Sequence, residues 1–82
     1  MTLIDSTVTG NTAFTFGGGI YNVSIGTVTL IDSTVTGNTV AVAGGRGGGI
    51  LNECGGTLVG AVAGGNVFNN TPDNIANGLF GC

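Results

Sequence analysis

Apolar and polar residues alternate along most of the chain in short runs, and glycine or asparagine separates one run from the next. The first ten residues show the pattern, because Leu3 and Val8 lie among threonine and serine and Gly10 ends the run. Residues 20–24 form another short run of the same kind. Alternation with a period of two predicts half-buried β-strands, and the many β-branched residues and glycines disfavour helix. The pattern therefore predicts short strands joined by tight turns.

One stretch of the sequence occurs twice. Residues 2–12 (TLIDSTVTGNT) recur without change at 29–39, which gives a period of 27 residues. A third and less regular unit begins at residue 56, where Gly-Thr-Leu-Val follows the Gly-Thr-Val of 26–28 by 30 residues. A fixed period of this length is typical of stacked repeats, in which each unit buries its apolar face against the next. The sequence therefore predicts a parallel β-solenoid.

The spacing of the glycine triplets locates an insertion. The triplets at 17–19 and 47–49 lie 30 residues apart, three more than the period. The additional residues therefore fall within 40–46, in a loop that can lengthen without disturbing the strands on either side. Pro72 should end a strand of the third unit, because proline cannot donate to a ladder. We expect residues 78–82 (GLFGC) to be a degraded copy of the glycine-triplet segment.

Stacking in register would place equivalent side chains one above another. Val28 and Leu30 should then point inward from one strand. Asparagines recur beside the turns, where they tolerate a bent backbone and can bond the same amide group in the neighbouring coil. The residues that we expect in these structural columns are Asn11, Asn38, Asn70, Asn22, Asn52, Val8, Val35, Leu3, Leu30, Ile20 and Ile50.

Charged residues are scarce, and this excludes several classes of function. Arg46 stands against four carboxylates, which gives a net charge of −3. One arginine cannot replace the counterions of a nucleic acid or attract an anionic membrane, so we expect neither partner. No apolar run suits a membrane-spanning helix, and residues 1–10 lack the basic and apolar parts of a signal peptide. Since the chain has no histidine for a zinc site or a Cys-His nucleophile, we predict no catalytic residue, no metal and no cofactor.

Several motifs resemble those of a known repeat family. Residues 17–22 (GGGIYN) follow a Gly-Gly-aliphatic pattern, and an aliphatic residue stands three positions before Asn at Val8/Asn11 and at Val35/Asn38. These motifs are similar to the polymorphic outer-membrane-protein repeat of large bacterial surface proteins. Residues 71–74 (TPDN) also resemble a motif that ends repeats in such proteins. The resemblance implies a right-handed parallel β-helix of the kind found in adhesin and autotransporter passengers.

We therefore predict an all-β protein whose single domain, residues 1–82, forms a right-handed parallel β-helix of about three short coils. The approximate coils are 1–26, 27–55 and 56–82. The resemblance implies a non-enzymatic structural or adhesive role at the cell surface or outside the cell, in a piece of a longer array, with a host surface or a glycan as partner. Unpaired strand edges at both ends, with little charge to oppose pairing, also predict self-association.

Two aspartates support an alternative function. Asp5 and Asp32 occupy equivalent positions and would lie about 5 Å apart in adjacent coils. Pectate-lyase-like enzymes share this fold and use clustered carboxylates for Ca²⁺ together with a basic residue, which here would be Arg46. The alternative is therefore a remnant of a polysaccharide-binding or polysaccharide-cleaving β-helix. Turn residues that bond local backbone amides account for the same two aspartates without catalysis.

A second alternative concerns hydroxyl groups on one strand face. The residues expected to form an outward grid are Thr7, Thr9, Thr34 and Thr36. Some ice-binding β-solenoids display hydroxyls in this way on a flat, extended array. The third unit has no Thr-x-Thr to continue the grid, so ice binding ranks below the other two functions.

The two cysteines lie about one coil apart. Cys54 and Cys82 are separated by 28 positions. If residues 78–82 repeat the glycine-triplet segment, their Cα atoms would lie about 5 Å apart, within the range of a disulfide. Export would favour the Cys54–Cys82 bond, and a cytosolic location would leave two thiols.

Overall fold

The computed structural model describes residues 1–23 and 25–78, and in these ranges the protein contains strands and turns but no helix. No segment of the described residues forms a helix long and apolar enough to cross a membrane. The strands in chain order are β1 (Thr2–Ile4), β2 (Thr7–Thr9), β3 (Thr12–Ala13), β4 (Ile20–Asn22), β5 (Thr27–Ile31), β6 (Thr34–Thr36), β7 (Thr39–Val40), β8 (Ile50–Asn52), β9 (Thr57–Val59), β10 (Val67–Phe68) and β11 (Ile75–Asn77).

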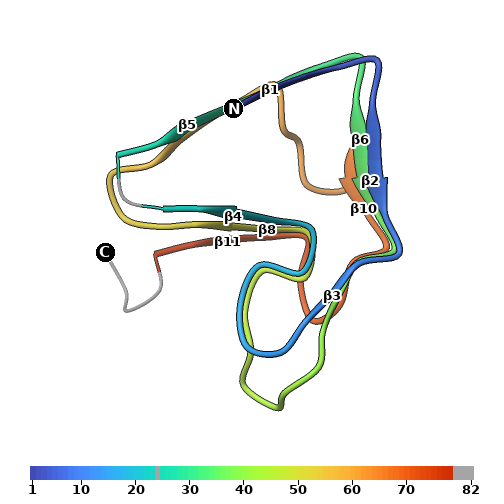
Figure 1. Ribbon diagram of the computed structural model, residues 1–82, viewed down its shortest axis with the longest axis vertical. Coiled ribbons are helices and arrows are strands. Elements are labelled where there is room, and N and C mark those ends of the chain that lie inside the picture. The colour runs from blue at the N-terminus through green and yellow to red at the C-terminus, as the bar shows by residue number, and fades with distance from the viewer. Residues whose placement is uncertain (24, 79–82) are drawn as a thin grey trace.

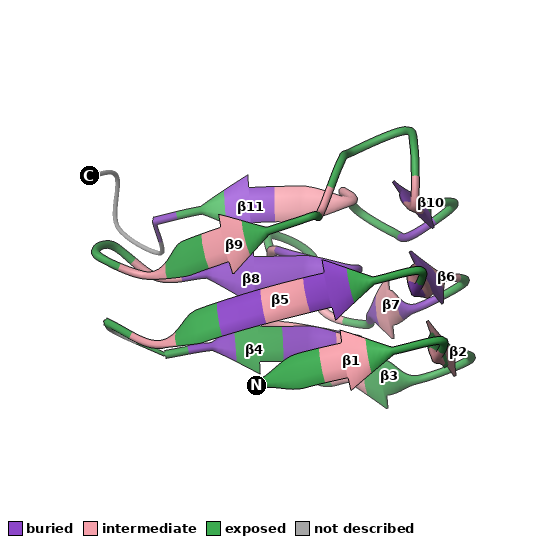
Figure 2. Ribbon diagram, turned by 90° about the horizontal axis from the view of Figure 1, so that it is seen from above, coloured by how far each residue is buried: buried purple, intermediate pink, exposed green. Residues whose placement is uncertain are grey.

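The strands stack into parallel sheets, as predicted for a β-solenoid. Three sheets have the orders β1-β5-β9, β2-β6-β10 and β4-β8-β11, and β3 pairs with β7 in a fourth. Coil 1 thus contains β1–β4, coil 2 contains β5–β8 and coil 3 contains β9–β11. The chain runs clockwise in Figure 1, and Figure 2 shows that each successive coil lies farther from that viewpoint. The coil is therefore right-handed, which confirms the predicted fold class.

The register of the first two coils follows the sequence repeat. Leu3 pairs with Leu30 and Val8 pairs with Val35, so equivalent residues are 27 apart. After the intervening loop, Ile20 pairs with Ile50 and the offset is 30. Parallel pairing at about 4.8 Å brings each side chain into contact with its counterpart in the next coil.

The insertion in coil 2 lies inside the stretch 40–46 that the sequence predicted. Val42 N donates to Phe14 O at 3.1 Å, and Phe16 forms an isolated bridge with Arg46. The three extra residues between these anchors are Ala43–Gly45. A turn closed by Gly45 N donating to Val42 O at 3.0 Å holds them. Figure 1 shows that this loop of coil 2 extends beyond the corresponding loop of coil 1.

Coil 3 departs from the sequence prediction. The register aligns residues 72–74 with the glycine triplet of coil 2, because Ile75 pairs with Ile50 and Asn77 pairs with Asn52. Residues 79–82, most of the segment that the sequence predicts to repeat the triplet, lie outside the described residues. The chain reaches this register early, since five positions separate Asn70 from Ile75, against twelve from Asn38 to Ile50. Coil 3 therefore omits most of the loop that precedes β8 in coil 2.

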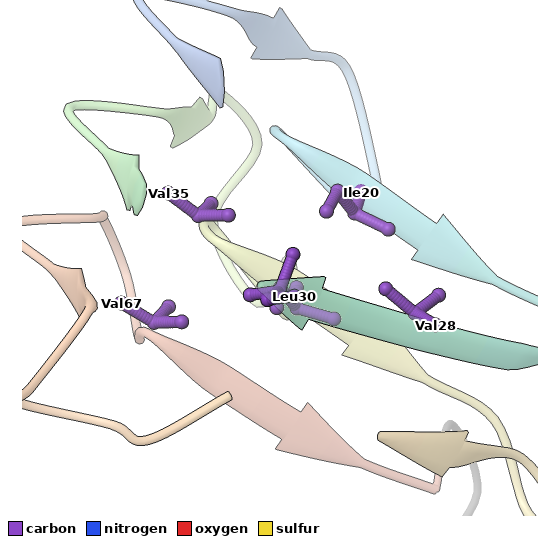
Figure 3. Close-up of a cluster of buried hydrophobic side chains, with 6 residues drawn as sticks. Ile20, Val28, Leu30, Val35 and Val67 are labelled. Atoms are coloured by element: carbon purple, nitrogen blue, oxygen red, sulfur yellow. The ribbon is translucent and has the colours of Figure 1, made fainter. Parts of the chain in front are cut away.

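The interior is a narrow apolar column. Val35, Ile50 and Val67 are fully buried, and Val28 and Leu30 are 2% and 5% exposed. Figure 3 shows Val28 and Leu30 from β5 directed into the same cluster as Ile20, Val35 and Val67. Leu3 and Val8 of coil 1 pack against this cluster but are only partly buried, because none of the described residues covers them from the N-terminal side. Coil 2 is therefore the best-packed part of the molecule.

Candidate functional site

The most organised polar feature is a column of asparagines that runs through all three coils. In coil 1, Asn11 donates to Asn38 Oδ1 from its backbone N at 3.0 Å and from Nδ2 at 3.1 Å. Asn38 repeats this with Asn70 Oδ1, at 2.9 Å from N and 3.0 Å from Nδ2. The buried Asn38 Nδ2 also donates to Val8 O at 3.0 Å. Each asparagine therefore bonds the next one in the column, and Asn38 also bonds a backbone carbonyl of the coil before it.

A second asparagine column lies on the β4-β8-β11 side. Asn22 Nδ2 donates to Asn52 Oδ1 at 2.7 Å, and Asn52 Nδ2 donates to Asn77 Oδ1 at 3.1 Å. The same Nδ2 groups bond Gly26 O and Gly56 O, which fixes the following turns. Asn77 was not among the residues expected from the sequence. The signal was present, because Ile-x-Asn occurs in each unit, at 20–22, 50–52 and 75–77.

Residues 71–74 close the first asparagine column and join coil 3 to coil 2. Asp73 Oδ1 accepts from Gly47 N at 2.6 Å and from Gly48 N at 3.1 Å. Asn74 Oδ1 accepts from both Asn70 N and Asn70 Nδ2, at 3.1 and 3.2 Å. These two roles were not predicted from the sequence. An acidic side chain that accepts two backbone N–H groups is held firmly in place, so the short connection is well defined.

The structure does not bring the candidate lyase residues into one site. Asp5 and Asp32 follow β1 and β5 at the same corner, both with φ of 49°, and both are exposed. Arg46 lies instead in the loop that leads to β8, which Figure 1 places at the opposite end of the molecule from that corner. Asp5 N donates to Ile31 O at 2.9 Å, so its backbone belongs to the coil-to-coil ladder. The left-handed backbone that Asp tolerates at this corner explains the repeated aspartates.

The threonine grid forms on the β2-β6 face but stops there. Thr7 pairs with Thr34 and Thr9 pairs with Thr36. In coil 3, Phe68 takes the place next to Thr36. The adjacent face of β1-β5-β9 is also uncharged, and it exposes Ile4, Ile31 and Val59 at 59%, 45% and 48%. Two neighbouring sides of the column therefore present hydroxyl and aliphatic groups to solvent.

One exposed polar contact links coil 1 to coil 2. The Tyr21 hydroxyl donates to Glu53 Oε1 at 2.6 Å. The pKa of Tyr21 is raised above its ordinary value of 10.0, chiefly by this hydrogen bond. Desolvation of the phenol and the negative charge of Glu53 raise it further. The phenol is therefore held in its neutral form, since it donates to a carboxylate.

Clusters that could hold a metal ion are absent from residues 1–23 and 25–78, where no three His, Cys, Asp or Glu side chains converge. Cys54 lies in the turn after β8. Cys54 is disulfide-bonded, and none of the described residues is a free cysteine. The predicted partner Cys82 lies outside the described residues, so the Cys54–Cys82 pairing remains a prediction.

Comparison with known proteins supports the resemblance on which the fold was predicted. Residues 5–23 match the model of the Chlamydia polymorphic membrane protein repeat. The matched segment covers β2, β3 and β4 and contains Asn11, the glycine triplet and Asn22. No curated protein and no solved structure matches the chain. The likeness to this repeat, together with parallel stacked strands, makes the chain similar to a β-helix repeat of bacterial surface proteins.

Proposed function

We propose that this chain is a non-enzymatic structural module of a β-helix displayed at the cell surface or outside the cell, with adhesive contacts on its outward strand faces. The likeness of residues 5–23 to a repeat of membrane proteins supports the surface role. The stacked parallel strands support the structural role, because coils of this kind extend a column by adding one register-matched layer at a time.

The hydrogen bonds of the buried polar residues are the main support for this proposal. The buried polar side chains are Asn22, Ser33, Asn38, Asn52 and Asn70. Each one bonds a neighbouring coil or its own turn, and no buried polar side-chain atom of the described residues lacks a partner. The repeated polar residues that would be candidates for chemistry are therefore engaged in holding the coils together. This is the pattern of a scaffold whose recognition groups lie outside the column.

The contact surface that we assign to adhesion is the β1-β5-β9 face. It carries Ile4 and Ile31 in one column and Thr2, Thr29 and Val59 in the next. No charged residue lies within these strands. A face of threonine and aliphatic groups suits contact with the apolar faces of sugar rings or with another uncharged protein surface, since neither contact would bury an unpaired charge.

A paired binding and lyase assay tests the proposal. Beads coated with the chain should bind a glycan array or cultured host cells, and no polysaccharide of the array should be cleaved. The double variant Ile4→Lys and Val59→Lys should abolish bead binding, because it places charge on the face, while Thr7→Lys and Thr9→Lys on the neighbouring face should not. Cleavage of any polysaccharide that is lost in the Asp32→Asn variant would overturn the proposal, as would binding insensitive to all four lysines.

A further inference from the structure

The two ends of the column differ in their asparagines. In coils 1 and 2, the backbone N and Nδ2 of each asparagine donate to the Oδ1 of the asparagine in the next coil. Asn70 has no next coil in the described chain, yet it makes the same two bonds, to Asn74 Oδ1. Asn74 therefore supplies within coil 3 the oxygen that a fourth coil would otherwise provide.

Position 74 also carries a side chain where the earlier coils carry glycine. Because Ile75 pairs with Ile50 and Ile50 pairs with Ile20, Asn74 is the counterpart of Gly49 and Gly19. A Cβ on Gly19 would lie 2.9 Å from Asn38 Nδ2, and a Cβ on Gly49 would lie 2.7 Å from Asn70 Nδ2. The glycines are thus needed to leave room for the asparagine of the following coil. At position 74 that room is already filled.

We propose that Asn74 closes the C-terminal end of the column and that the N-terminal end is the surface that binds another coil. This inference rests on the proposed structural function and gives the module a direction. The occupant is a parallel coil that carries an asparagine at the column position and a Gly-Gly pair before its Ile-x-Asn strand. Such a coil continues the coil 1–coil 2 interface, whose contacts are already known.

The N-terminal end is prepared for this occupant. Asn11 is exposed, and none of the described residues donates to its Oδ1. Leu3 and Val8 are half-buried at the same end and need one more layer to be covered. The added coil would donate its asparagine N and Nδ2 to Asn11 Oδ1. The added coil needs Gly-Gly for the same reason as coil 1, in which a Cβ on Gly18 would lie 2.7 Å from Thr39 O of the next coil.

A second copy of this chain does not meet these requirements with its C-terminal end. In coil 3 the Gly-Gly pair is replaced by Asp73 and Asn74. Figure 2 also shows that the segment between β9 and β10 rises above the level of coil 3 on the side away from coil 2. Head-to-tail stacking of identical chains is therefore blocked, and the self-association that the sequence predicts for both ends is restricted to the N-terminal end.

Two fusion proteins test the direction of stacking. In the first, a duplicate of residues 2–28 is inserted between Met1 and Thr2, which preserves the 27-residue register. In the second, residues 23–52 are joined after Asn77. The first fusion should melt at least about 5 °C above the parent chain, because one coil interface is added and small domains respond by several degrees to such a gain. The second fusion should show no rise.

Matched variants separate stacking from the mere addition of residues. In the first fusion, Gly18→Asp and Gly19→Asn within the added copy should remove the gain. In the second fusion, Asp73→Gly together with Asn74→Gly should produce a gain that was absent before. A second fusion as stable as the first, or a first fusion no more stable than the parent, would overturn the proposal. Neither result depends on bead binding, so adhesion can fail while the direction of stacking stands.

The size of the parent chain at increasing concentration gives an independent readout. The proposal allows a monomer or a dimer, and any dimer should persist in the first fusion because the added coil presents the same N-terminal surface. Filaments that grow with concentration would contradict it, since growth requires both ends to pair.

Discussion

Asn38 and Asn70 are joined twice, because the backbone N and the Nδ2 of Asn38 both donate to Asn70 Oδ1, at 2.9 and 3.0 Å, in a buried part of the column. The same Nδ2 also bonds Val8 O. The Asn38 side chain therefore bonds coil 1 and coil 3. A polar network of this kind stabilises the fold only when every member is satisfied.

Replacement of Asn38 by alanine should lower the free energy of unfolding by about 2–3 kcal/mol, because Val8 O and Asn11 lose buried partners. The loss is measured by urea unfolding of the purified variant. Asn11→Ala is the matched control, since Asn11 is exposed and its backbone bond to Asn38 Oδ1 is retained. Its cost should stay below about 1 kcal/mol. Equal costs for the two variants would show that the column does not depend on its central member.

Val35 should be the most sensitive position of the apolar column. It is fully buried and pairs with Val8 on one side and Val67 on the other. Val35→Ala should cost about 2–3 kcal/mol, through lost burial and the cavity left between two coils. The neighbouring Thr9→Ala lies on the outward face and should change stability by no more than about 0.5 kcal/mol. A small effect of Val35→Ala in the same urea experiment would contradict the packing described.

Position 48 requires glycine because the backbone of coil 3 lies too close for a side chain, and not because of an unusual backbone conformation. A Cβ at this position would lie 2.1 Å from Thr71 O, and its φ is not in the left-handed region. Gly48→Ala should therefore cost about 3 kcal/mol or more, because the connection to coil 3 must move. Gly44→Ala serves as the comparison, since φ is +82° and no atom lies within 4 Å of the added Cβ. Its cost should be about 1–2 kcal/mol, from the backbone strain alone. Thermal unfolding followed by circular dichroism distinguishes the two, and the opposite order would refute the close contact.

The Tyr21–Glu53 hydrogen bond predicts a pH dependence. Because the pKa of Tyr21 is raised in the folded protein, the stabilisation from this bond is fully present below the unfolded pKa of about 10 and is lost as the pH rises through the folded pKa. Tyr21 is the single tyrosine, so the ultraviolet absorbance of phenolate reports on it alone. Glu53→Gln should lower the titration midpoint of Tyr21, because it removes the negative charge that accepts the hydrogen bond of the phenol. Asp32→Asn, at a different corner, should leave the midpoint unchanged; identical midpoints in all three proteins would show that the contact does not form in solution.

The sequence predicts the first two coils well because the residues that stack in them belong to an identical repeated segment. Leu3/Leu30 and Val8/Val35 follow directly from the eleven-residue duplication. The inserted loop could be placed only within 40–46, since a loop outside the ladder carries no periodic signal. The structure narrows it to Ala43–Gly45 through the turn that Gly45 closes.

Coil 3 was harder to predict because it lacks the glycine pair that marks the register of the first two coils. Asp73 and Asn74 replace the Gly-Gly pair, so the motif used to align the first two coils disappears where the chain shortens. Position 74 does not need glycine because no fourth asparagine lies above it in the described chain. The Ile-x-Asn triplet at 75–77 was the remaining sign of the correct register. Asp5 and Asp32 show that a repeat can also mislead, because the sequence offers them as a carboxylate pair and the structure shows two equivalent turns.

Paired cysteines on the outward face test the parallel register most directly. Thr9 and Thr36 are register partners, so their Cα atoms should lie about 4.8 Å apart, within the range that a disulfide spans. Thr7 and Thr36 are displaced by two residues and should lie about 8 Å apart, beyond that range. Mild oxidation of the folded Thr9→Cys/Thr36→Cys variant, followed by peptide mapping, should give the 9–36 bond, and the Thr7→Cys/Thr36→Cys variant should give none. Formation of the 7–36 bond, or failure of the 9–36 bond in a folded variant, would contradict the stacked register on which the account depends.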